Sequence, residues 1–321
     1  MGDNAGHEVR QSFETWLVLA LGLSVGLAGV GVIGAGGVSR DPPIIPEAPK
    51  LETVSPDSAK ALEQIFEQAD YGWPPSSGAS VPRLAVTALP DDLADRAVRH
   101  KKTLFLRSLL PLILAENRTI RHERGFLKRY FDHGDFRPGA WATRRAKLIA
   151  ERFGIRGDLS ERSIQTKLLN RVDEVPPALA LAQAAIESGW GTSRFALQGN
   201  SLFGQWTWRE DQGLTPSARP EGARHSVRAF PNLRASVRAY FHNLNTFHAY
   251  AKFRRLRAAM RRAGKPLDPL ALTAGLDRYS QRGDEYVTEV KAMIESNRLA
   301  THLRNVHLAE AEPELEASAE R

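Results

Sequence analysis

Pro176–Gly191, PPALALAQAAIESGWG, is the segment on which the fold prediction rests, because it has the features of a buried helix with a functional end. The prolines suit a first helical turn, whose backbone N–H groups lack intrahelical acceptors. Gly189 suits the exit, where left-handed dihedrals are common. Gln183 and Glu187 lie four residues apart, one helical turn above the other. The segment therefore predicts an apolar helix that presents one carboxylate, Glu187, at its C-terminal end.

The surroundings of Glu187 distinguish it from an ordinary surface glutamate. Most glutamates near helix ends are solvated, but this one follows an apolar run of small residues and precedes Trp190. Such surroundings raise the pKa of a carboxyl group because they disfavour its charged form. A raised pKa is what a general acid for glycosidic-bond cleavage needs. Residues 192–206 are rich in glycine, aromatic and amide side chains, which suits a sugar cleft.

Helical periodicity continues over much of the chain. The apolar spacing predicts helices over residues 91–130, 141–153, 160–172, 233–260 and 284–303. Pro111 is expected to kink the first of these helices or to divide it in two. Residues 203–208 and 225–230 instead have the pattern of short strands around a glycine- and proline-rich turn region. We therefore expect a mainly α fold with a small β-hairpin lobe beside a helical body.

The N-terminal part of the chain contains a long uncharged stretch. We predict a tail over residues 1–15 and a transmembrane anchor over residues 16–38, because the latter exceeds the roughly 20 residues that cross a hydrocarbon core. The alternative is a signal peptide that is cleaved near residues 34–36.

Two further segments have the composition of connecting or terminal regions. Residues 39–88 are rich in proline and predict a linker, interrupted by a short helix over 58–69. Residues 306–321 are acidic and predict a disordered tail.

Composition excludes several classes of site. The chain has no cysteine, so it forms neither a disulfide nor a thiolate metal site. Its formal charge is +7, but the arginines of residues 254–262 accompany no recognition module, so we expect no nucleic-acid binding. We expect a solvated basic face, and the alternative is contact with peptide carboxylates or anionic lipid. His242 and His248 belong to no His-Glu-x-x-His array and are expected at the surface or in packing. No phosphate-binding glycine pattern is present, so we predict neither metal nor cofactor.

Several separated motifs are similar to those of one known family. Leu181–Ala196, LAQAAIESGWGTSRFA, is followed by GNSLFG at Gly199–Gly204, with DEVPP at 173–177 before them and YSQRG at 279–283 after them. In this order the motifs resemble the glucosaminidase family, glycoside hydrolase family 73, in its bacterial Bax-like branch. The resemblance covers about 89–299, and we take residues 89–305 as the catalytic domain.

The resemblance implies a lysozyme-like helical fold and a peptidoglycan hydrolase that cuts the β-1,4 bond after N-acetylglucosamine in glycan strands. Peptidoglycan lies outside the bacterial inner membrane, so a single-pass protein with its catalytic domain in the periplasm is expected. Signal cleavage would instead give a secreted periplasmic protein. The alternatives for function are a lytic transglycosylase and a non-catalytic peptidoglycan-binding protein.

The family's catalytic glutamate falls on Glu187, within Glu-Ser-Gly-Trp-Gly. Glu221, in the predicted lobe, is our candidate for the second carboxylate, and its alternative is a solvated turn residue. The mechanism is inverting if the two carboxyls leave room for a water, or substrate-assisted if the sugar's own acetamido oxygen attacks.

Tyr279 is the third catalytic candidate. It begins a segment similar to the family's Tyr-Ala-Thr-Asp motif, but here the aspartate is displaced to Asp284, which suits a helix cap. Tyr286 is expected to serve in packing. The residues expected to line the cleft and bind substrate are Gln183, Trp190, Asn200, Phe203, Gln205 and Trp206. For Trp190, a place in the core is an equal alternative.

Overall fold

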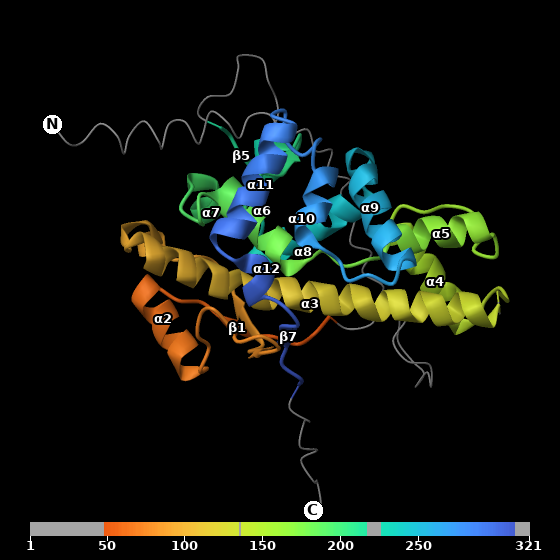
Figure 1. Ribbon diagram of the computed structural model, residues 1–321, viewed down its shortest axis with the longest axis horizontal. Coiled ribbons are helices and arrows are strands. Elements are labelled where there is room, and N and C mark those ends of the chain that lie inside the picture. Colours follow the sequence, from red (N-terminus) through yellow and green to blue (C-terminus); the bar gives the residue numbers. More distant parts are fainter. Residues whose placement is uncertain (1–47, 135, 217–225, 312–321) are drawn as a thin grey trace, which may run out of the picture.

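The computed structural model describes residues 48–134, 136–216 and 226–311, and within them the chain is mainly helical (Figure 1). The predicted tail 1–15 and anchor 16–38 lie outside these ranges, as does Glu221. Among the helices in the described ranges, none combines the length and the apolar character that a membrane crossing requires.

The structure has the following helical elements in chain order: α2 (Ala59–Gln68), η2 (Asp91–Asp95), α3 (Val98–His133), α4 (Trp141–Arg152), α5 (Arg162–Arg171), α6 (Pro177–Ser188), α7 (Arg194–Gly199), η3 (Glu210–Gln212), α8 (Leu233–Thr246), η4 (His248–Tyr250), α9 (Ala251–Arg262), α10 (Pro269–Leu272), η5 (Thr273–Gly275), α11 (Asp284–Ser296) and α12 (Leu299–His302). The strands are β1 (Glu52–Val54), β2 (Ser80–Val81), β3 (Leu84–Val86), β4 (Trp206–Thr207), β5 (Gly213–Leu214), β6 (Ser226–Arg228) and β7 (His307–Leu308).

Helix α3 is the longest element and crosses the whole width of the molecule (Figure 1). Its middle is buried on all sides, and it ends at Gly134, whose left-handed φ of 66° suits a glycine. Pro111 lies inside this helix, so the prediction that it divides residues 91–130 into two helices is wrong. Proline removes one backbone donor, and the buried neighbours Leu109, Leu112 and Ile113 hold the helix together across that point.

Helix α6 confirms the helix predicted from Pro176–Gly191. Pro177 occupies its first turn, and Gly189 ends it with a φ of 59°. The helix packs against both α3 and α11, and its residues are buried on every face except near its two ends. This central position explains the small residues, because alanine lets neighbouring helices approach closely.

The lobe predicted over residues 203–230 is present as a small antiparallel sheet with β6 in its centre. Trp206 of β4 pairs with Val227 of β6, and Leu214 of β5 pairs with the same residue on the other side. Gly213 is required here because a Cβ would lie 2.6 Å from the Cβ of Ser226. The sheet therefore has three short strands rather than the two of a simple hairpin.

Residues 48–88 differ from the linker predicted over 39–88. Helix α2 buries Leu62 and Phe66 in the core, β1 pairs with β3, and β2 pairs with β7 at the other end of the described chain. The short helix predicted over 58–69 is present as α2, but the proline-rich composition gives no sign that this helix and the strands beside it pack into the core. The start of the tail predicted over 306–321 likewise forms β7 instead of remaining disordered, because Leu308 is buried.

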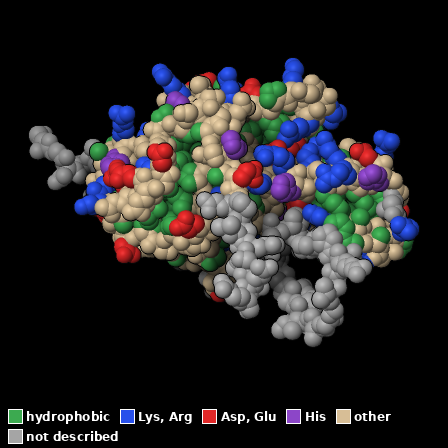
Figure 2. All heavy atoms as spheres, turned by 90° about the horizontal axis from the view of Figure 1, so that it is seen from below, with side chains coloured by type: hydrophobic (Ala, Val, Ile, Leu, Met, Phe, Trp, Pro, Cys, Tyr) green, Lys and Arg blue, Asp and Glu red, His purple; other side chains and the backbone are tan. Residues whose placement is uncertain are grey.

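Three other expectations need correction in detail. The helix predicted over 233–260 is divided at Phe247, whose backbone is extended, and the helix over 284–303 is divided at Arg298, which is left-handed. The basic face over 254–262 is not fully solvated, because Arg254 and Arg257 are buried. Basic side chains elsewhere stand among acidic and polar ones, as on the face drawn in Figure 2.

Candidate active site

The C-terminal end of α6 holds Glu187 in a rigid turn. The hydroxyl of Ser188 donates to the carbonyl of Ala184 at 2.6 Å and accepts from the backbone N–H of Gly191 at 2.9 Å. Gly191 has a φ of +79°, and a Cβ there would lie 2.3 Å from the side chain of Leu89. The exit from the helix therefore requires glycine, and its path fixes where the Glu187 carboxyl group lies.

A chain of hydrogen bonds leads from α8 through α6 to the carboxyl group of Glu187. The Tyr240 hydroxyl donates to Gln183 Oε1 at 2.7 Å, and Gln183 Nε2 donates to the Tyr286 hydroxyl at 2.9 Å. The Tyr286 hydroxyl donates in turn to the carboxylate of Glu187. Because Gln183 and Glu187 lie one turn apart on α6, a single tyrosine of α11 reaches both of them.

Burial raises the pKa of Glu187 to about 7 because a carboxylate loses hydration among apolar side chains. The hydrogen bond from Tyr286 opposes this shift, the negative charge of Glu289 adds to it, and Arg282 opposes it. Arg282 and Glu289 form an ion pair of 2.5 Å. The C-terminal end of a helix also disfavours a negative charge. Glu187 thus exchanges a proton near neutral pH while remaining partly accessible to solvent.

Aromatic rings form a wall beside this carboxyl group. Tyr279 stacks on Tyr286 with ring centroids 5.3 Å apart, and Tyr250 lies 5.7 Å from Tyr279 on its other side. The Tyr279 hydroxyl donates to the carbonyl of Phe203 at 3.0 Å. Burial raises the pKa of Tyr279 well above its usual value, and the charge of Glu187 raises it further. The hydroxyl therefore stays protonated and acts as a hydrogen-bond donor.

Three of the residues predicted to bind substrate lie behind the surface of the site. Gln183 has no exposed side-chain area, and both ends of its amide are used by tyrosines. Phe203 stacks on Tyr240 at 3.9 Å, and Trp206 is 3% exposed. These three residues support the site from behind its surface. The sequence does not distinguish this role from lining the cleft, because aromatic and amide side chains suit both.

Asn200 and Gln205 are predicted sugar-binding residues whose amide oxygens have no hydrogen-bond partner among the described residues. Asn200 Nδ2 donates to the carbonyl of Phe230 at 3.2 Å. Asn200 Oδ1 and Gln205 Oε1 are buried and have no hydrogen-bond partner among the described residues. Buried acceptors usually have a partner, but because both oxygens are inaccessible, a ligand reaches them only if neighbouring groups move. Trp190 is half-buried, with its ring 5.8 Å from that of Phe105.

The sequence prediction missed most of the tyrosines that surround Glu187. Tyr240 and Tyr250 were not singled out as site residues, and Tyr286 was assigned to packing although its hydroxyl bonds Glu187. Their signal was weak because the three come from α8, η4 and α11, and only the fold brings them together. Asp284 lies in the first turn of α11, where Gly283 occupies the cap position.

The two histidines named from the sequence, His242 and His248, contact backbone or aromatic groups. His242 Nε2 lies 2.9 Å from the carbonyl of Arg152, and the exposed His248 has its ring 4.3 Å from Phe247. Within residues 48–134, 136–216 and 226–311, there is no group of three or more His, Asp or Glu side chains that could hold a metal ion.

Comparison with known proteins places this site in a family. Residues 165–299 match the Glucosaminidase family model, described as mannosyl-glycoprotein endo-beta-N-acetylglucosaminidase. Protein bax of Escherichia coli strain K12 is 34% identical over 220 residues, which cover 68% of this chain and 78% of that protein. The chain belongs to the glucosaminidase family. No solved structure matches it.

As a glucosaminidase, the protein is a glycoside hydrolase of the endo-β-N-acetylglucosaminidase class. The matched residues run from α5 to the first residue of α12 and include Glu187 together with Tyr240, Tyr250, Tyr279 and Tyr286. The matched region thus contains both the raised-pKa carboxyl group and the tyrosine that donates to it. The segments before it, α2 and α3 among them, complete the core on which α6 rests.

Proposed function

We propose that this glucosaminidase is a peptidoglycan hydrolase that cleaves the β-1,4 bond after N-acetylglucosamine, with Glu187 as the general acid. The observation that carries the proposal is the carboxyl group of Glu187, which lies partly accessible at the end of the central helix. Burial raises the pKa of this group to about 7. Such a group is protonated in slightly acidic solution and gives up its proton readily. A helical body with a glutamate at a helix end beside a small sheet is also what a lysozyme-like arrangement requires.

In the proposed reaction, Glu187 donates its proton to the glycosidic oxygen as the bond to the leaving sugar breaks. The carboxylate that forms accepts the hydrogen bond of Tyr286, which favours the charged form. Asn200 and Gln205 bind the acetamido N–H or hydroxyl groups of the sugar if their buried amide oxygens become accessible when the sugar enters. Tyr279, held by the carbonyl of Phe203, contributes one face of the aromatic wall.

The group that attacks the anomeric carbon is open between two candidates. Glu221 would activate a water from the lobe, and separations of roughly 6.5–9.5 Å between the two carboxyls would then give inversion. Alternatively, the sugar's own acetamido oxygen attacks, and no second carboxylate is required. The stereochemistry of the first product separates them, since direct displacement by water inverts the anomeric carbon once, whereas acetamido attack followed by water inverts it twice and retains the configuration.

We also propose that residues 16–38 anchor the protein in the bacterial inner membrane and that the catalytic domain works in the periplasm. The support is the length of the uncharged stretch. Expression of the full chain followed by membrane fractionation and N-terminal sequencing tests it. A chain found in the soluble periplasmic fraction with a new N-terminus near residues 34–36 would instead establish a cleaved signal.

Digestion of purified sacculi tests the proposed activity. The full chain and Glu187→Gln are incubated in parallel, and borohydride-reduced fragments are identified by mass spectrometry. Reduced N-acetylglucosamine ends from the wild type alone are expected. Anhydro-muramic ends would show a lytic transglycosylase instead, and saccharide binding without products from either form would show a binding protein.

A further inference from the structure

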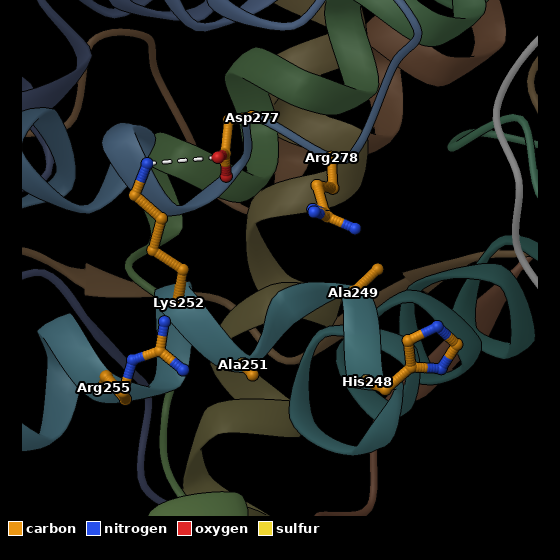
Figure 3. A pocket seen from close by; sticks show the side chains of 7 residues that line it. All are labelled: His248, Ala249, Ala251, Lys252, Arg255, Asp277 and Arg278. Carbon is orange, nitrogen blue, oxygen red and sulfur yellow. Dashed lines mark hydrogen bonds and ion pairs between the residues drawn. The ribbon is translucent and has the colours of Figure 1, made fainter.

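A basic pocket of about 340 Å³ lies between η4, the start of α9 and the segment that follows η5 (Figure 3). Its lining consists of His248, Ala249, Ala251, Lys252, Arg255, Asp277 and Arg278. The lining therefore carries three permanent positive charges and one negative charge. The alanines form an uncharged floor, which leaves space between the long side chains of the rim.

The charges of this pocket are only partly balanced. Lys252 Nζ lies 3.1 Å from Asp277 Oδ2, so these two groups neutralise each other. Within the described part of the chain, neither Arg255 nor Arg278 has a hydrogen-bond or ion-pair partner. Figure 3 shows the side chain of Arg278 extending toward the side of the pocket that Ala249 occupies. Two guanidinium groups beside an uncharged floor form a site for an anion.

The backbone around the pocket is fixed by close packing. A Cβ at Gly275 would lie 2.4 Å from the Cα of Phe253, so η5 touches the backbone of α9 directly. This contact sets the distance between the segment that carries Arg278 and the helix that carries Arg255. The arrangement is therefore part of the folded core and does not depend on a loop that must close.

The pocket adjoins the aromatic wall of the candidate active site. Ala249 and Ala251 flank Tyr250, and Arg278 directly precedes Tyr279. Both tyrosines are buried, and both sense the charge of Glu187. The pocket lining is thus contiguous in sequence with two tyrosines that lie near Glu187.

We propose that this pocket binds a carboxylate of the peptide stem carried by the sugar next to the cleaved bond, an inference that rests on the proposed peptidoglycan activity. N-acetylglucosamine is uncharged, whereas the neighbouring muramic acid carries a peptide with free carboxylates. Guanidinium groups recognise carboxylates through paired, charge-assisted hydrogen bonds. Arg255 and Arg278 are therefore specificity residues for peptide-bearing strands, with Lys252 held by Asp277 at the rim.

The test compares two forms of one substrate. The full chain and the double variant Arg255→Gln/Arg278→Gln digest intact glycan strands and strands stripped of peptides by an amidase. We expect the ratio of kcat/KM on peptide-bearing strands to that on stripped strands to fall roughly tenfold in the variant. Arg162→Gln on α5 is the control for loss of an exposed arginine outside the pocket, and it removes one of the two positive charges that the double variant removes. Its ratio should equal that of the wild type.

A binding measurement separates failure of this inference from failure of the proposed activity. A disaccharide-peptide is titrated into Glu187→Gln with and without the two arginine changes, so that affinity is measured without turnover. Loss of affinity for the disaccharide-peptide, with affinity for the peptide-free disaccharide retained, supports the pocket even if sacculi are not cleaved. Equal affinities in both backgrounds overturn it.

A lipid surface is the competing source of anions for this pocket. The same variants test it. Co-sedimentation with phosphatidylglycerol vesicles is measured for the wild type, the double variant and Arg162→Gln. If the double variant alone loses vesicle binding and keeps its preference for peptide-bearing strands, the pocket serves a membrane surface and the proposal fails. A kcat/KM that falls equally on both substrates also contradicts it, because the arginines would then act on structure or on the glycan itself.

Discussion

Helix α6 has a carboxylate beside each of its ends, and the two have opposite surroundings. Asp173 lies just before the N-terminal end and Glu187 lies at the C-terminal end. Asp173 is surrounded by guanidinium groups, whereas Glu187 is surrounded by tyrosines and an amide. The pKa of Asp173 is lowered although burial opposes this, while burial raises the pKa of Glu187 to about 7. Partners rather than burial alone decide which carboxyl group stays charged.

The cluster around Asp173 has the geometry of a structural anchor. Arg261 Nη2 lies 2.8 Å from Asp173 Oδ1, and the fully buried Arg257 donates to the backbone carbonyls of Asp173 and Glu174 at 3.0 and 2.9 Å. Arg257 also donates to Asn245 Oδ1 at 2.7 Å, which links α9 to α8. A carboxylate with this many cationic partners has no proton to give. It fixes the start of α6, and the helix transmits that position to Glu187.

The largest expected effect is on activity. Glu187→Gln keeps the shape of the protonated side chain but removes the proton donor, so the rate on sacculi should fall roughly a thousandfold at pH 6. The measurement is release of reducing ends under identical conditions. Glu285→Gln, at an exposed position of α11, is the matched control and should retain wild-type activity. Retained activity in Glu187→Gln would show that Glu187 is not the general acid.

The next effect is on stability and concerns the other end of the helix. Arg257→Met removes one of the cations around Asp173 and leaves the buried carbonyls of Asn170, Asp173 and Glu174 without this donor, so the free energy of unfolding should fall by about 3–5 kcal/mol. Chemical denaturation measures it. Arg262→Met, at an exposed position of the same helix, should change the free energy of unfolding by less than about 0.5 kcal/mol. If the two variants are equally stable, the Asp173 cluster is not an anchor.

The two carboxyl groups also predict opposite responses of stability to pH. Folded Glu187 binds its proton more tightly than an ordinary glutamate with a pKa of 4.5, so its contribution to stability is present below about pH 4.5 and is lost as the pH rises through about 7. Asp173 has a folded pKa below 3.8, so its contribution is present above that pH and is lost as the pH falls through the folded value.

Glu187→Gln isolates the first of these two contributions, because glutamine does not ionise. The variant should gain up to about 3 kcal/mol in the free energy of unfolding over the wild type at pH 8, and little at pH 4. Unfolding by urea at both pH values measures the difference. A gain of the same size at both would mean that the charge of Glu187 is not the cause.

A smaller effect is expected from the tyrosine that donates a hydrogen bond to Glu187. Tyr286→Phe removes the donor to the Glu187 carboxylate, so the pKa of Glu187 should rise and the alkaline limb of the activity profile should move up by roughly 0.5–1 pH unit. The pH dependence of kcat/KM measures it. Tyr130→Phe, whose hydroxyl donates to Thr143 at 3.2 Å in another part of the core, should leave the limb unchanged. A downward shift in Tyr286→Phe would contradict the bonding direction.

The same contrast explains what could be predicted from the sequence. Glu187 was predictable because its helix, its glycine exit and its apolar approach are contiguous in the chain. The tyrosines were not, because Tyr240, Tyr250 and Tyr286 meet only through the packing of separate elements. The Asp173 cluster was hidden for the same reason, since Arg257 has the local sequence pattern of a solvated basic helix. Local patterns identify the group that reacts, and tertiary contacts decide how it is tuned.

The parallel pairing of β2 with β7 has a consequence for how the domain assembles. Ser80 pairs with His307 and Val81 with Leu308, so two segments separated by most of the described sequence share one small sheet. Contacts of such long sequence separation form late and slow the folding rate, because a large loop must close first. Arg83 donates to the carbonyls of both Lys50 and Ala309, which favours a circular permutant in which residues 48 and 311 are joined by a flexible linker and new ends open at an exposed turn. Enzymatic activity in such a permutant would show that the order of the elements along the chain is dispensable once the sheet has closed.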